Sequence, residues 1–183
     1  MGKDVRWYAL KVFYRKVPEL RADLSRVGIE YYYPLQDDGK PYVQSLLFVR
    51  CSERQIEQLR FKEPVSGSFS VYSHLEKRRR LFSEETYERL VPAPIDEQEM
   101  AVFMLVTSAS PDKYEILGPD EAKYHTGELV RVTSGPFEGL EGRVKRIKKD
   151  RRLVVCITGV VAVATVHIDP RLLEPVDGHT TAA

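Results

Sequence analysis

The chain has 183 residues, of which 43% are apolar and 30% are charged. This composition is typical of a globular protein and excludes both a wholly disordered chain and an integral membrane protein. No run of about 18 apolar residues occurs, and the charged residues 1–6 are not followed by a cleavable apolar segment. We therefore expect a cytoplasmic protein that has no membrane partner.

The formal net charge is only +1, but the charges are unevenly distributed. Residues 143–152 contain seven basic residues and a single acidic one. A local positive field therefore survives there although the total charge nearly cancels. The two cysteines, Cys51 and Cys156, lie in apolar strand-like runs. That setting predicts buried thiols and not a disulfide or a metal site.

Residues 1–107 alternate between strand-like and helix-like patterns. Runs of aromatic and β-branched residues predict strands at 5–13, 29–35, 43–50 and 69–72. Apolar residues at helical spacing predict a helix that begins near Pro18 and ends at Gly28, and further helices that begin after Ser52 and after Asp96. Ser83 to Glu85 also resembles a helix start. This order predicts an α+β layer, in which helices pack on an antiparallel sheet.

Residues 108–123 contain two prolines and a glycine and follow neither period, which is typical of a linker. Beyond them the sequence predicts only short strands, at 129–134, 143–148, 153–158, 161–168 and from 172. Five short strands in about fifty residues favour a small closed barrel, because closure removes exposed edges. We therefore predict a first domain at 1–107, a linker at 108–123, an all-β domain at 124–176 and a mobile tail at 177–183.

Glycines punctuate residues 127–144 in a specific pattern. Gly135 and Pro136 predict a tight turn, Gly139 a backbone conformation that other residues avoid, and Gly142 a close approach of strands. This segment resembles a KOW motif.

The first domain carries a second resemblance. Trp7-Tyr8 in the first strand, the segment YYYPL and the segment LLFV resemble the N-terminal (NGN) domain of NusG transcription factors. The resemblance covers about residues 5–176 in the same domain order. VQSLLFVR and ITGVVAVATVHI look most like the specialised NusG paralogues of the UpxY type, which act on capsular polysaccharide operons.

The resemblance implies a fold and a function. The expected fold is a ferredoxin- or RRM-like NGN domain followed by a small SH3-like KOW barrel. The expected function is transcription elongation and antitermination, in which the NGN domain grips the clamp helices of the largest RNA polymerase subunit. The KOW domain of such factors recruits Rho or a ribosomal protein. We expect a monomer.

The resemblance also assigns candidate residues. It places polymerase contacts on Val43, Leu46, Phe48 and Tyr8, and a KOW partner contact on Phe137. Strand alternation puts Leu46 and Phe48 on one face. Apolar strand residues of this kind are equally typical of an ordinary sheet core.

Basic residues provide a separate set of candidates. Arg15, Lys16, Arg78, Arg79 and Arg80 either form solvated surface or contact the phosphates of non-template or upstream DNA. The basic hairpin 143–152 has the same two interpretations, with RNA as its partner. The alternative function is therefore an RNA- or ribosome-binding KOW protein.

Nothing in the sequence indicates catalysis. His74, His125, His167 and His179 lack metal-ligand spacing, and no glycine-rich phosphate loop follows a strand. No nucleophile or carboxylate pair occupies a recognisable catalytic setting. We therefore expect neither enzymatic activity nor a metal or cofactor.

Overall fold

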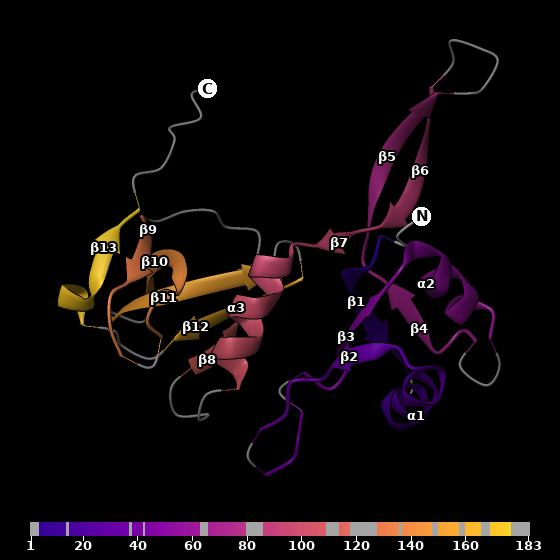
Figure 1. Ribbon diagram of the computed structural model, residues 1–183, viewed down its shortest axis with the longest axis horizontal. Coiled ribbons are helices and arrows are strands. Elements are labelled where there is room, and N and C mark those ends of the chain that lie inside the picture. The colour runs from indigo at the N-terminus through magenta and orange to yellow at the C-terminus, as the bar shows by residue number, and fades with distance from the viewer. Residues whose placement is uncertain are drawn as a thin grey trace. The chain divides into compact units, whose positions relative to one another are not determined.

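The computed structural model describes twelve segments of the chain (Figure 1): 4–13, 15–36, 38–41, 43–62, 66–79, 86–108, 114–117, 128–135, 137–147, 150–157, 160–165 and 169–176. The chain forms two compact units. Unit 1 comprises Met1–Tyr33 and Val43–Glu97, and unit 2 comprises Pro34–Tyr42 and Gln98–Ala183. Helices and antiparallel sheets together confirm the predicted mixed α+β class.

Unit 1 is built on an antiparallel sheet with the strand order β2-β3-β1-β4, in which a short β7 also pairs with β1. The strands are β1 (Arg6–Val12), β2 (Glu30–Tyr32), β3 (Leu46–Cys51), β4 (Phe69–Val71) and β7 (Pro94–Ile95). Each of the four strands predicted in 1–107 is present. The third begins at Leu46 and not at Val43, because a turn precedes it in which the Leu46 amide donates to the Val43 carbonyl (3.2 Å).

Helix α1 begins and ends where the sequence predicts, and helix α2 begins where it predicts. Helix α1 (Val17–Val27) has a proline in its first turn and ends at Gly28, whose φ of 70° is the left-handed conformation that glycine tolerates best. Helix α2 (Glu53–Arg60) begins with a complete capping box, in which the Ser52 and Gln55 side chains each accept from the other residue's backbone amide.

Both helices pack on one face of this sheet, which we call the helix-covered face. Alternation in β1 and β3 directs every second side chain to it. Its buried strand residues are Tyr8, Leu10, Val12, Leu47, Val49, Cys51, Phe69 and Val71, which pack with Val17, Leu20 and Leu24 of α1 and Ile56 and Leu59 of α2.

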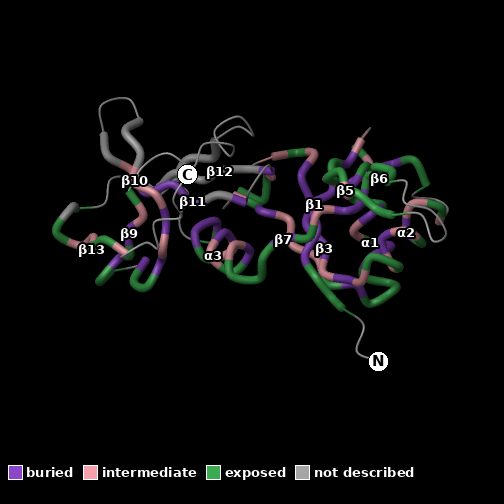
Figure 2. Tube along the Cα trace, turned by 90° about the horizontal axis from the view of Figure 1, so that it is seen from above, coloured by how far each residue is buried: buried purple, intermediate pink, exposed green. Residues whose placement is uncertain are grey.

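Unit 1 also contains a two-stranded ribbon that the sequence did not predict. Strands β5 (Ser73–Arg79) and β6 (Thr86–Pro92) pair along their whole length and extend away from the sheet (Figure 1). Most of the ribbon is exposed (Figure 2). The predicted helix start at 83–85 lies outside the described residues, and the residues that follow it are the strand β6.

Unit 2 contains a six-stranded antiparallel sheet with the order β13-β9-β10-β11-β12-β8. Its strands are β8 (Tyr114–Leu117), β9 (Leu129–Val132), β10 (Glu141–Ile147), β11 (Asp150–Ile157), β12 (Val161–Thr165) and β13 (Leu173–Pro175), the last preceded by a 3₁₀ turn at Pro170–Leu172. The last five correspond to the five predicted strands.

Three features of unit 2 differ from the expected domain organisation. Strand β8 lies within the predicted linker and pairs with β12. Helix α3 (Glu97–Thr107) falls, apart from its first residue, in unit 2. The segment Pro34–Tyr42, which carries an isolated bridge between Leu35 and Pro41, also belongs to unit 2. The predicted tail at 177–183 lies outside the described residues. In the described part of the chain, no helix has the length and apolar character needed to cross a membrane.

The glycines between β9 and β10 have distinct roles. Gly135 and Gly139 have φ values of 92° and 80°, and the Gly139 amide donates to the Val132 carbonyl (2.8 Å). Gly142 is needed for space, because a Cβ there would lie 2.9 Å from the Val154 carbonyl oxygen. The crowded neighbour is therefore β11, on the opposite side of β10 from β9.

Gly142→Ala is expected to destabilise unit 2 by about 2–3 kcal/mol, because the added methyl overlaps a backbone atom that cannot swing away. Hydrogen exchange of the β9 and β10 amides measures this effect. The control is Gly139→Asn, which meets no neighbouring atom and should cost about 1 kcal/mol or less. Equal protection in the wild-type protein and Gly142→Ala would contradict the steric role.

A buried carboxylate joins α1 to the end of α2. Asp23 is buried, pairs with Arg26 one turn later, and lies 3.0 Å from the Lys62 ammonium through Oδ2. The hydrogen bond from Arg26, aided by Lys62, lowers the pKa of the Asp23 carboxyl. Ionised Asp23 therefore stabilises the fold.

Asp23→Asn is expected to lower the free energy of unfolding at pH 7 by about 1–2 kcal/mol, since two cations lose their shared acceptor. A carboxyl whose folded-state pKa is depressed stabilises above its unfolded pKa of about 4, and this contribution disappears as the pH falls through the folded-state value. Denaturation of both proteins between pH 7 and pH 3 should therefore show their difference shrinking in acid. A pH-independent difference would contradict the ionic origin.

Candidate functional site

The face of the unit 1 sheet opposite α1 and α2 is the candidate interaction surface, and we call it the second face. In the register, Ala9 lies opposite Phe48 and Trp7 opposite Arg50. On the other side of β3, Tyr32 lies opposite Phe48, and their ring centroids are 6.5 Å apart. The predicted placement of Leu46 and Phe48 on one face is confirmed.

The apolar side chains of the second face are buried. Leu46 and Trp7 are each 4% exposed, and Phe48 and Ala9 are fully buried. None of these four belongs to the cluster that packs with α1 and α2. Binding of a partner through Leu46 or Phe48 therefore requires that this face become accessible.

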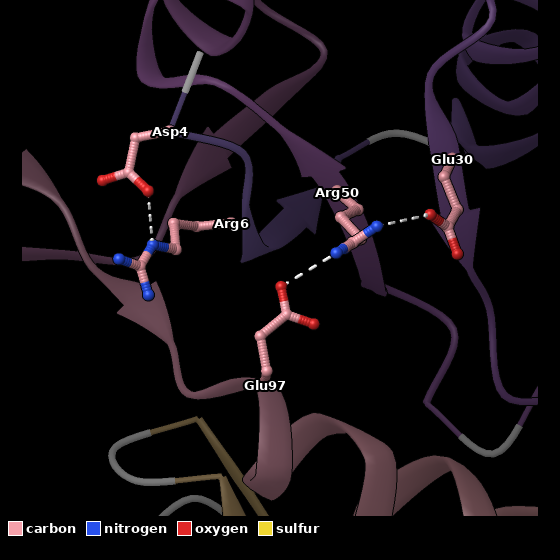
Figure 3. Close-up of polar contacts among 5 residues, drawn as sticks. All are labelled: Asp4, Arg6, Glu30, Arg50 and Glu97. Atoms are coloured by element: carbon pink, nitrogen blue, oxygen red, sulfur yellow. Dashed lines mark hydrogen bonds and ion pairs between the residues drawn. The ribbon is translucent and has the colours of Figure 1, made fainter. Parts of the chain in front are cut away.

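Charged residues border the second face at one end (Figure 3). The Arg50 guanidinium reaches Glu97 at 3.2 Å and Glu30 at 3.5 Å, and close by Arg6 pairs with Asp4 at 2.9 Å. The hydrogen bond to Glu97 further raises the pKa of Arg50, so its charge is permanent. These side chains are exposed, so the pairs contribute little to stability and leave charged groups available to a partner.

The four residues predicted to bind polymerase do not share one surface. Tyr8 belongs to the helix-covered face, where burial raises the pKa of its hydroxyl. Val43 is half-buried in the turn before β3. Only Leu46 and Phe48 lie together on the second face.

The residues predicted to bind nucleic acid lie in two separate places, after the end of β1 and on the ribbon. Arg15 is exposed just after β1 with a φ of 58°, and Lys16 pairs with Glu19 at 2.6 Å. The ribbon leaves beside the middle of β1, between the stretches that pair with β4 and β7, where the Tyr72 amide donates to the Ala9 carbonyl (3.0 Å). At about 3.3 Å per strand residue, Arg78 lies about 20 Å beyond Tyr72.

The consecutive basic residues 77–79 lie on two different faces of the ribbon. Arg78 lies opposite Tyr87 and pairs with Glu76 at 2.8 Å. Lys77 and Arg79 lie on the other face. Arg80 is outside the described residues. A single surface formed by Arg15, Lys16, Arg78 and Arg79 is therefore absent from this structure.

In unit 2, Phe137 is only 8% exposed, so the predicted partner-binding ring is largely buried.

The hairpin of β10 and β11 pairs basic residues with one another. Lys145 lies directly opposite Arg152, and Arg146 directly opposite Arg151. The register therefore gathers four basic residues on one hairpin, which is a candidate contact for an anionic partner.

The described residues offer no cluster of three or more histidine, cysteine or acidic side chains arranged to hold a metal ion. Cys51 is a buried free thiol, and desolvation raises its pKa to about 12. It is therefore inert as a nucleophile at neutral pH. The side chain of Cys156 lies outside the described set.

The ribbon is the feature that sequence reasoning missed. Its signal is present in Thr86–Pro92, where threonine, tyrosine, leucine and valine favour a strand. The charged run in Ser73–Arg79 obscured the partner strand, because charged residues are not typical of strands that pack on a core.

Comparison with protein families finds a KOW motif at residues 126–169. The match spans β9 to β12 and confirms the motif predicted from the glycine pattern. A comparison with curated protein sequences finds no match. The chain is therefore a KOW-containing protein, a class that includes NusG-like and ribosomal or RNA-binding proteins.

Proposed function

We propose that this chain is a NusG-type transcription elongation and antitermination factor. The observation that carries the proposal is a KOW motif at 126–169 that follows an α+β unit with an antiparallel sheet. The proposal assigns unit 1 to an NGN domain with a ferredoxin- or RRM-like fold. It assigns the strands from β9 to β13 to an SH3-like barrel, in which β13 returns beside β9.

In this proposal the second face of unit 1 binds the clamp helices of the largest RNA polymerase subunit. Its support is the apolar pair Leu46 and Phe48, which lies outside the core formed with α1 and α2, beside the charged Arg50. Because both side chains are buried, the proposal includes the opening of this face on binding. A factor that binds the closed, elongating polymerase better than other conformers raises the population of that conformer. The result is reduced pausing and termination, with polysaccharide operons as the proposed targets.

The proposed activity is binding without catalysis and takes place in the cytoplasm. The KOW unit is the proposed contact for a ribosomal protein or Rho, and exposed basic residues outside the ribbon, such as Arg15, are the proposed contacts for non-template or upstream DNA. Neither role requires a cofactor.

Phe48→Glu is expected to abolish binding to an isolated clamp-helix fragment and to remove the antipausing effect on a template with a strong pause. The charge would have to be desolvated in an apolar contact. Phe48→Leu keeps an apolar side chain and should bind within about 3-fold of the wild-type protein. Fluorescence anisotropy and single-round transcription are the measurements.

Because Phe48 is fully buried, a charge at this position can also unfold the protein. A second variant, at a more exposed residue on the edge of the same face, therefore completes the test. Arg50→Ala removes solvent-screened surface ion pairs and should leave thermal unfolding nearly unchanged. It should weaken clamp-helix binding about 3- to 10-fold, as loss of a charged contact at the edge of an interface does. Wild-type protein that neither binds the fragment nor changes pausing at saturation would refute the proposal.

The second candidate function is RNA or ribosome binding through the basic hairpin. The register pairs Lys145–Arg152 and Arg146–Arg151 favour it, because they gather four basic residues on one hairpin and phosphates bind such a concentration of positive charge. This candidate predicts no binding to clamp helices.

Replacing Arg146, Lys148 and Lys149 by glutamine tests the second candidate. If RNA phosphates are the ligand, affinity for a structured RNA should fall at least 10-fold. The slope of log affinity against log salt concentration should also become less steep by about two to three, because about that many fewer counterions are released on binding. Filter binding between 50 and 300 mM salt measures both quantities. RNA binding that is independent of salt, or unaffected by the three substitutions, would exclude this role.

A further inference from the structure

The ribbon presents two exposed leucines side by side. Leu75 on β5 lies directly opposite Leu90 on β6, and they are 61% and 66% exposed. Facing side chains in an antiparallel pair have Cβ atoms about 5 Å apart, so the two leucines form one apolar patch. Lys77 and Glu88 follow on the same face, then Arg79 and Thr86. We call this the leucine face.

The opposite face of the ribbon makes contacts within unit 1. Val91 is buried opposite His74, and the Arg89 guanidinium reaches Glu57 of α2 at 3.2 Å. At the ribbon's base the Ala93 amide donates to the Tyr72 carbonyl (2.9 Å). These contacts set the orientation of the ribbon and leave the leucine face to the solvent.

An exposed apolar patch on a projecting strand pair marks an interaction site. Nucleic acid presents phosphates and sugars along its backbone, which cannot replace water around two leucines. An apolar protein surface can do so. Lys77 and Arg79, against the single acidic Glu88 among the described residues of this face, favour carboxylates at the edge of that surface.

We propose that the leucine face docks on a protein surface of RNA polymerase that has an apolar centre and carboxylates at its edge. This inference rests on the proposed function. The ribbon extends seven residues, or about 23 Å, from the sheet, so it makes a second contact away from the second face. Two contacts on one partner strengthen binding, because the second association is intramolecular.

The test is the double variant Leu75→Thr/Leu90→Thr, which keeps residues that favour strands. The matched control is Tyr87→Thr, an exposed residue on the opposite face of the ribbon. Both variants should unfold like the wild-type protein, since neither removes a buried side chain. The double variant should bind core RNA polymerase about 10- to 100-fold more weakly, and the control within about 3-fold.

Binding to the isolated clamp-helix fragment separates the two proposals. Both variants should bind the fragment as the wild-type protein does, because the fragment lacks the second contact. If the wild-type protein binds neither fragment nor core enzyme, both proposals fail. If it binds both and the double variant binds core enzyme with unchanged affinity, the docking proposal alone fails.

Photo-crosslinking identifies what covers the leucines. A benzophenone amino acid at position 75 should form an adduct with a polymerase subunit in an elongation complex, and one at position 87 should not. An adduct with DNA at position 75, or no adduct there, would overturn the assignment of a protein partner.

Discussion

The pairing of β1 with β3 determines which side chains are available for function in unit 1. Six consecutive register pairs, from Arg6 opposite Cys51 to Lys11 opposite Leu46, fix the alternation of both strands. A shift of one strand by one residue would exchange the two faces of that strand completely. If β3 shifted, Leu47 would leave the helix-covered face and Phe48 would enter it, while the side chains of β1 would stay where they are. Because α1 and α2 need a continuous apolar surface, the register and the second face are specified together.

This constraint explains why the central strands are apolar on both sides. Five of the six residues in Leu46–Cys51 are buried, and the sixth, Arg50, is half-buried at the end of the strand. A strand that served only the α1–α2 core would need apolar residues at alternate positions. The additional apolar positions give this sheet a second surface that excludes water, and Arg50 marks where that surface ends.

Local sequence signals predicted the elements well where a short-range rule determines the structure. The capping box at Ser52 and the left-handed stop at Gly28 depend on atoms a few residues away. The glycine pattern also predicted a close approach at Gly142, but not that the crowded neighbour is Val154 on β11. Long-range pairing was harder to predict. Strand β8 exists because β12 offers an open edge, and nothing within Tyr114–Leu117 specifies that partner. Helix α3 has an apolar stripe at Met100 and Phe103, but a stripe does not identify the unit on which it packs.

The candidate site residues could likewise be predicted only in part from the sequence. Alternation correctly placed Leu46 with Phe48, but the type of residue alone could not distinguish Tyr8, which faces α1 and α2. A run of consecutive basic residues resembles one positive surface only until its secondary structure is known. In a strand, Lys77, Arg78 and Arg79 point to alternate faces, and Glu76 neutralises the face that carries Arg78. The leucines share the other face with Lys77 and Arg79, which exceed the single acidic residue among the described residues of that face, Glu88. The exposed apolar pair and this excess of positive charge therefore face the same partner. A ligand that satisfies only the charges would leave the leucines in water, and this is why the ribbon favours a protein surface over a phosphate backbone.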